Sequence, residues 1–227
     1  MQNQRIKKRK RFWLFIALRT AANILIISGI IFSLLSFAPF VQQEVWYWWR
    51  THFGPEEQIN LPVNTSVQAK ELPKLKVKPV DTQFGIVIEK IGVNSPVVPN
   101  VNAASYREYI AALAKGVAHA KGTAFPGSTS SDNNNVFLFA HSAINAFEAR
   151  KYNSVFYLLR KLTKGDRVVT FYKGKRYDYI VSDKKVVKAN DVRYLTDPSK
   201  TPILTLQTCD PPGSSLRRLI ITAKLIQ

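Results

Sequence analysis

The sequence has very few residues that could form covalent or metal cross-links. Its 227 residues include one cysteine and three histidines, so an internal disulfide is excluded. No group of histidine, cysteine, aspartate and glutamate has the spacing of metal ligands, and neither a metal nor a cofactor is expected. The single cysteine, Cys209, is therefore either a small packing residue or a reactive thiol.

Acidic residues are also scarce, with 15 against 33 lysines and arginines, which gives a net charge of +18. The chain after residue 20 still has 26 basic against 15 acidic residues. A surplus of this size is typical of nucleic-acid-binding proteins, but the sequence has no recognition motif for nucleic acid, and no such partner is expected. Anionic lipid headgroups and wall polymers, or solvent alone, are the alternatives.

Charge is entirely absent from residues 20–40. At a helical rise of about 1.5 Å, about 20 apolar residues are enough to cross a bilayer. Seven basic residues precede the segment, and the aromatic residues 46–49 follow it, as is typical of a membrane interface. We therefore predict a basic cytoplasmic tail at 1–19, a transmembrane anchor at 20–40, and the chain after Val41 outside the cell.

A cleaved signal peptide is the alternative for this segment. Residues 36–38 loosely resemble a cleavage site, but Pro39 would follow the cut directly. The apolar stretch is also longer than the core of about 7–15 residues that signal peptides have. An uncleaved single-pass anchor is the favoured interpretation. Residues 41–82, rich in proline, lysine and glutamate from residue 51 onward, are predicted to be a juxtamembrane tether.

The remaining residues, 83–227, predict one folded domain in which short strands dominate. Runs of β-branched and aliphatic residues favour strands, whereas helical spacing of apolar residues occurs only twice. Many short strands with one or two helices are typical of a closed or nearly closed β-barrel, so the predicted class is all-β-dominated. The expected strands are 83–91, 136–140, 201–208, 219–226 and a hairpin at 167–181, and the expected helices are 104–114 and 145–162.

Cys209 lies where a predicted strand ends and a loop rich in proline and glycine begins. Arg218 lies at the start of the next strand, and His141 lies at the end of an earlier one. Cysteine–histidine pairs are assembled in space, so their separation in sequence is no objection. A thiol attacks as the thiolate, an imidazole can move the proton, and a guanidinium can stabilise an oxyanion. Together these residue types predict nucleophilic catalysis.

The same residues resemble the signature of a known family, the sortases. The chain has Thr-Leu-Gln-Thr-Cys at 205–209, Arg-Leu-Ile-Ile from residue 218, and the order His141, Cys209, Arg218. Further matching segments are Ile-Glu-Lys-Ile-Gly at 88–92, Gly-Thr-Ala-Phe-Pro-Gly at 122–127, and Leu-x-x-Leu-x-x-Gly-Asp within 158–169. The resemblance covers residues 83–227. It departs from the family at Ala140-His141-Ser142, where many members have Gly-His-Arg.

The resemblance implies a closed eight-stranded β-barrel and a membrane-anchored cysteine transpeptidase. His141, Cys209 and Arg218 would be catalytic, and the hydroxyl of Thr208 would contact substrate. The implied reaction cleaves a Leu-Pro-x-Thr-Gly-like sorting signal of a secreted protein between threonine and glycine. It passes through a thioacyl intermediate on Cys209, and the acyl group goes to an amine of a peptidoglycan precursor or of a pilin-like subunit. The implied location is the cell membrane, with the catalytic domain outside.

Two residues compete with this assignment. His119 precedes the 122–127 segment, where the family's catalytic histidine does not lie, and we expect it to be structural. Arg217 competes with Arg218, but alternation along the last strand and the family's Arg-Leu-Ile spacing favour Arg218.

Three other classes of protein are alternatives to this interpretation. Papain-like and cell-wall hydrolases usually place cysteine before histidine, and L,D-transpeptidases place histidine two residues before cysteine. Neither order occurs here. A membrane-anchored adhesion or scaffold domain would be indicated by the loss of one catalytic residue, and all three are present.

Overall fold

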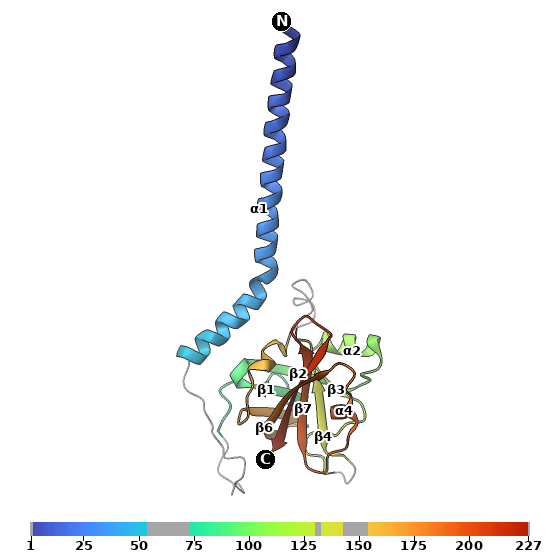
Figure 1. Cartoon of the computed structure of the whole chain (residues 1–227). Helices are drawn as coiled ribbons and strands as arrows, with labels where there is room; N and C mark the ends of the chain where they lie inside the picture. Colours follow the sequence, from blue (N-terminus) through green and yellow to red (C-terminus); the bar gives the residue numbers. More distant parts are fainter. Residues whose placement is uncertain (1, 54–72, 130–132, 143–153, 227) are drawn as a thin grey trace. The chain divides into compact units, whose positions relative to one another are not determined.

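The computed structural model describes residues 2–53, 73–129, 133–142 and 154–226 (Figure 1). The chain divides into two compact units, residues 1–46 and 47–227. Each unit is described by itself below.

The N-terminal region is one long helix, α1, at Gln2–Phe53. Its stretch Phe12–Ser36, 25 residues long, is apolar enough to cross a membrane, and none of it is buried against the rest of the protein. This stretch begins earlier than the predicted start at residue 20, because Arg19 is the only charged residue inside it. A helix that is apolar on every face and packs against nothing is suited to lipid.

The second unit is a closed barrel of eight strands (Figure 1), as the sequence led us to expect. Around the barrel the strand order is β1-β2-β3-β4-β7-β8-β6-β5, and β5 pairs with β1 to close it. The pairs β2–β3 and β4–β7 are parallel, and the other pairs are antiparallel. The strands are β1 Phe84–Ile88, β2 Val93–Val101, β3 Val117–Ala120, β4 Asn135–Phe139, β5 Arg167–Tyr172, β6 Lys175–Lys188, β7 Ile203–Asp210 and β8 Arg217–Leu225.

The barrel interior is filled by aliphatic and aromatic side chains from every strand. Successive residues of a strand point to opposite faces, so one residue in two reaches the interior. Burial of these side chains is the main favourable term in folding, about 25 cal/mol for each Å² removed from water. Fully buried examples include Ile86, Ile88, Leu138, Leu159, Leu204, Leu206, Ile220 and Ile221.

Among the described residues, four short helices lie between the strands: η1 Glu89–Ile91, α2 Tyr106–Leu113, η2 Tyr157–Lys161 and α4 Arg193–Thr196. The helix predicted at 104–114 corresponds to α2. Of the helix predicted at 145–162, residues 143–153 lie outside the described residues. The described remainder contains only the 3-10 helix η2, which is 5 residues long.

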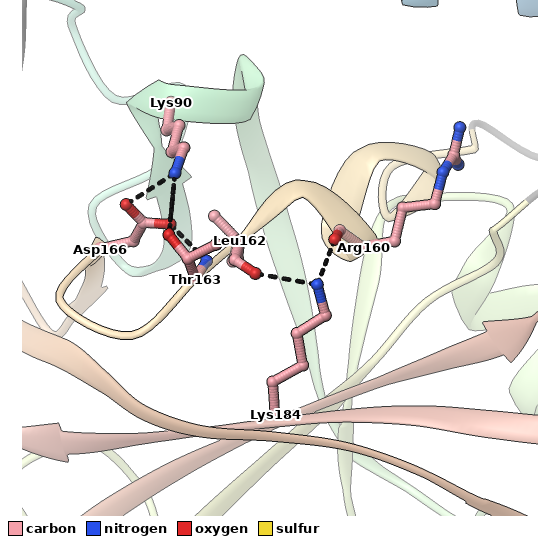
Figure 2. Close-up of polar contacts among 6 residues, drawn as sticks. All are labelled: Lys90, Arg160, Leu162, Thr163, Asp166 and Lys184. Atoms are coloured by element: carbon pink, nitrogen blue, oxygen red, sulfur yellow. Dashed lines mark hydrogen bonds and ion pairs between the residues drawn. The ribbon is translucent and has the colours of Figure 1, made fainter.

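The end of η2 is held by a lysine from the barrel. The ammonium group of Lys184, on β6, donates to the carbonyl oxygens of Arg160 and Leu162 (Figure 2). A cation at these carbonyls satisfies the unpaired end of the helix and complements its dipole. In the turn that follows η2, Asp166 accepts from the Thr163 amide at 2.6 Å and forms an ion pair with Lys90 at 2.8 Å (Figure 2).

Residues 73–81, here called the strap, lie along the outside of the barrel. Leu75 of the strap packs against a cluster of Val87, Val169 and Phe171, from β1 and β5. Val80 donates its amide to the side chain of Asn94 at 2.9 Å, and the Asn94 amide group donates to the carbonyl of Lys78 at 2.8 Å. The strap therefore has both an apolar contact and specific hydrogen bonds to the barrel.

A buried ion pair fixes the beginning of the strap. The guanidinium of Arg167 contacts the carboxylate of Glu89 at 2.7 Å, and the two side chains are only 8% and 6% exposed. The same guanidinium donates to the carbonyl of Pro73 at 2.8 Å, and Glu89 accepts from the amide of Lys76 at 2.6 Å. Each charged group thus satisfies a backbone group of the strap as well as its partner.

Candidate active site

His141 and Cys209 lie side by side at one end of the barrel, because β4 and β7 are parallel neighbours. Phe139 pairs with Gln207 in the register of these two strands. One step further the amide of Ala140 donates to the carbonyl of Gln207 at 3.2 Å, so the ladder continues beyond the end of β4. Two residues after the Phe139–Gln207 pair, His141 is therefore level with Cys209.

Arg218 joins them from the other side of β7. Strands β7 and β8 are antiparallel, and Cys209 pairs directly with Arg218. Directly opposite residues of neighbouring strands place their side chains on the same face, with Cβ atoms about 4.5–5.5 Å apart. His141, Cys209 and Arg218 therefore form one row across β4, β7 and β8. We call these three residues, which the sequence predicts to be catalytic, the catalytic row.

The catalytic row lies on the outer face of the barrel. Leu204 and Leu206 of β7 are fully buried, whereas Gln207 and Cys209 are only half-buried. Alternation along the strand then turns Gln207 and Cys209 to the opposite face. Cys209 is half-buried, as a nucleophile must be if it is to be both fixed and accessible.

Thr208 holds the end of β4 in place. Its hydroxyl donates to the carbonyl of Ala140 at 2.8 Å, and its side chain is 4% exposed. The carbonyl of His141, the next residue, accepts from the amide of Phe156 at 3.1 Å. The backbone on either side of the His141 side chain is thus fixed by bonds to β7 and to the segment before η2. Thr208, expected to contact substrate, uses its hydroxyl here to position the histidine.

The two arginines at the start of β8 differ in their partners. Arg217 forms an ion pair with Asp210 at 2.9 Å, which is also its direct partner in the strand register. The guanidinium of Arg218 instead donates to two backbone carbonyls, those of Ser215 at 2.9 Å and Arg217 at 3.0 Å. Within the described residues, no carboxylate pairs with Arg218. Its charge is therefore available to an oxyanion, whereas that of Arg217 is already balanced.

The competing histidine lies away from the catalytic row. His119 is fully buried in β3, where its Nδ1 accepts from the amide of Asn100 at 3.3 Å. Its Nε2 then carries the proton and donates to the carbonyl of Ala124 at 3.0 Å. Burial lowers the pKa of His119, and its bond to Ala124 opposes this only in part. These contacts give His119 a structural role.

Tyr109 is a candidate site residue that the sequence reasoning missed. It belongs to α2, which packs against β2 and β3, and β3 is the neighbour of β4. Burial is the largest cause of the raised pKa of its phenol, and the charges of Cys209 and Arg218 also act on it. The only signal in the sequence is the spacing of Tyr106 and Tyr109, which share one face of a short helix.

In the parts of the chain that the structure describes, no three histidine, cysteine, aspartate or glutamate residues gather as metal ligands would.

Three comparisons relate this chain to known proteins. The family model for the sortase domain matches residues 86–226. Among curated proteins, none matches the chain. Sortase C-1 from Actinomyces oris is 27% identical, with a TM-score of 0.53, over 65% of this chain and 76% of that one.

Two further solved structures are similar. A sortase D5 transpeptidase from Clostridium perfringens is 26% identical, with a TM-score of 0.50, over 67% of this chain and 83% of that one. A pilus-related sortase C of Group B Streptococcus is 26% identical, with a TM-score of 0.51, over 66% and 70%. The barrel order, the site at the ends of β4 and β7, and the family model covering most of the barrel agree: the chain belongs to the sortase family.

Proposed function

We propose that this protein is a membrane-anchored cysteine transpeptidase that cleaves a Leu-Pro-x-Thr-Gly-like sorting signal and joins the new carboxyl end to an amine. The observation that carries the proposal is the catalytic row, in which a thiol lies between an imidazole and a guanidinium on neighbouring strands. Membership of the sortase family supports a transpeptidase of the cell-wall sorting type.

In the first half-reaction the thiolate of Cys209 attacks the carbonyl carbon between threonine and glycine of the signal. The carbonyl oxygen becomes a tetrahedral oxyanion, which the guanidinium of Arg218 stabilises when it exchanges its two backbone carbonyls for the substrate. The carbon–nitrogen bond then breaks, and the departing amine takes a proton from His141. The product is a thioester on Cys209.

In the second half-reaction an amine attacks the thioester, and His141 takes its proton. A new amide bond forms, and the thiolate of Cys209 leaves. A lysine of a pilin-like subunit and an amine of a peptidoglycan precursor are the two proposed acceptors. The pilus-related sortase C of Group B Streptococcus, similar over most of the barrel, supports the first.

The proposed location is the cell membrane, with the barrel outside. The apolar helix segment Phe12–Ser36 is long enough to cross a bilayer once. The basic residues that precede it favour a cytoplasmic N-terminus. Secreted proteins that carry a sorting signal would then meet the catalytic row after export.

The test uses the full chain in detergent and a quenched fluorescent Leu-Pro-x-Thr-Gly peptide library. We expect thiol-dependent cleavage by the wild type, none by Cys209→Ala, and a new amide product when an oligoglycine or lysine amine is added. Hydrolysis without any amide product would contradict transpeptidation. If no library member is cleaved and Cys209 is alkylated no faster than a free thiol, the protein is a scaffold.

A further inference from the structure

The 3-10 helix η2 connects the catalytic histidine with strand β6. At the start of the helix, the amide of Phe156 donates to the carbonyl of His141 at 3.1 Å. At its end, the ammonium group of Lys184, on β6, donates to the carbonyls of Arg160 and Leu162 (Figure 2). One short element therefore contacts the backbone of His141 at one end and a side chain of the barrel wall at the other.

Backbone hydrogen bonds run through η2 between these two ends. The amide of Leu159 donates to the carbonyl of Phe156, and the amide of Leu162 donates to the carbonyl of Leu159, each at 3.1 Å. Lys184 in turn donates to the carbonyl of Leu162 at 3.1 Å. The side chains of Phe156, Leu159 and Leu162 are fully buried, so the helix cannot shift without disturbing close-packed neighbours. A displacement at the Lys184 end is thereby passed on to the Phe156 end.

Lys184 belongs to the part of the sheet that also carries the thiol. It pairs with Ile221 of β8, and Ile221 pairs with Leu206 of β7, three residues before Cys209. The ammonium group has three donors, so it can hold two carbonyls at once. The barrel wall that supports the thiol and the helix that supports the histidine are thus joined at Lys184.

A lysine at the end of a helix commonly serves stability alone, because a cation there satisfies the last carbonyls. Lys184 differs from such a cap in two respects. It comes from another strand, 24 and 22 residues away in sequence from the two carbonyls that it bonds. The other end of the helix that it holds bonds directly to the backbone of His141.

We propose that Lys184 is a positioning residue of this site, which holds η2 where its first amide fixes His141 beside Cys209. This inference rests on the proposed function, because it takes His141 to be the group that moves the proton. Lys184 acts on the reaction through η2 and not by contact with substrate. Loss of its ammonium group leaves two carbonyls without this donor and lets the helix and the histidine move relative to the thiol. Small misplacements of a catalytic group are costly in rate.

The experiment compares wild type, Lys184→Met and Lys185→Met in the full chain in detergent. Lys184→Met keeps an unbranched side chain and removes the donors. Lys185→Met is the matched control, because Lys185 is the next residue of β6 and pairs instead with the exposed carboxylate of Asp183 at 2.9 Å. For each protein, kcat and KM are measured for cleavage of the Leu-Pro-x-Thr-Gly peptide, and pulse proteolysis in urea gives the unfolded fraction.

A second measurement reports on the imidazole itself and needs no substrate. The chain contains three histidines, so labelling their Cε1 atoms with 13C gives three ring signals in the NMR spectrum. The signal of His141 is the one that is missing in His141→Gln. The signal of His119, which is fully buried in β3, serves as the internal reference.

For Lys184→Met we expect kcat to fall about tenfold with KM nearly unchanged, and the His141 ring signal to move while that of His119 stays. Lys184→Arg, which again offers N–H donors, should recover part of the lost kcat. Lys185→Met should match wild type in every measurement. Wild-type kcat with an unmoved His141 signal in Lys184→Met would overturn the proposal, and so would an equal loss in Lys185→Met. A loss of kcat that the unfolded fraction accounts for would overturn it too, because Lys184 would then serve stability alone.

Failure of the proposed function gives a different result. If wild type cleaves no peptide, and the His141 signal moves in Lys184→Met but not in Lys185→Met, Lys184 positions the histidine in a protein that is not a transpeptidase. If wild type cleaves the peptide, and Lys184→Met equals it in kcat and in the His141 signal, transpeptidation stands and the role of Lys184 is wrong.

Discussion

Two arginines on the outside of the same barrel have opposite uses. Arg167 is 8% exposed and pairs with the equally buried Glu89, and it also donates to the strap at Pro73. Arg218 donates only to backbone carbonyls within the described residues, next to a half-buried thiol. A guanidinium whose charge is balanced by a buried carboxylate stabilises the fold. One that lacks a carboxylate can exchange its neutral partners for a developing negative charge.

The largest expected effect is on stability, and it follows from removing the arginine of the buried ion pair. Arg167→Met leaves the carboxylate of Glu89 buried without its partner, and we expect a loss of about 3–5 kcal/mol in the free energy of unfolding. Pulse proteolysis in urea measures this loss.

The matched control for that experiment is Arg193→Met. Arg193 also pairs with a carboxylate, that of Asp191 at 2.7 Å, but its side chain is 72% exposed. An exposed pair contributes about 0–1 kcal/mol, so the variant should unfold at nearly the wild-type urea concentration. Equal losses in Arg167→Met and Arg193→Met would show that burial of the first pair does not matter.

On the catalytic side, Arg218→Ala should leave stability nearly unchanged and lower kcat/KM for peptide cleavage by about 10²–10³, the cost of one oxyanion donor. Arg217→Ala, one residue away, removes a guanidinium that is already paired with Asp210. We expect its kcat/KM to fall less than tenfold. A larger loss for Arg217→Ala than for Arg218→Ala would reverse the assignment of the two arginines.

The smallest expected effect is the pH dependence of stability that His119 causes. Burial lowers the pKa of His119 in the folded protein, so the unfolded chain binds its proton more readily. Stability is then full above the ordinary histidine pKa of about 6.5 and falls as pH decreases below it. Urea unfolding of wild type and His119→Gln from pH 8 to pH 5 measures this. The variant should be less stable overall but should lose less stability on acidification, and an unchanged pH dependence would contradict the prediction.

The catalytic row could be predicted from sequence because strand ends are marked by their neighbours in the chain. A run of aliphatic residues before Cys209 and a proline- and glycine-rich loop after it place the thiol at an edge, and an apolar run at 136–140 also precedes His141. The family signature supplied the pairing that these local signals lacked. The structure adds the register that aligns the three side chains.

Other features depend on contacts between distant segments and could not be predicted. The strap has the composition of a flexible linker, and it is attached to the barrel by contacts of Pro73, Leu75, Lys76, Lys78 and Val80 with residues far away in the sequence. Glu89 and Arg167 are 78 residues apart, and nothing local marks them as a pair.

The position of the strap has a mechanical consequence. In the order of the strands around the barrel, β1 lies four places from β7, and β5 lies four places from β4. The strap therefore contacts the far side of the barrel. Tension applied to the chain before Pro73 therefore enters the domain through the Arg167 and Leu75 contacts, on β1 and β5, three or four places around the sheet from the strand that carries Cys209. The strands that hold the thiol and the imidazole, β7 and β4, make neither of these two contacts.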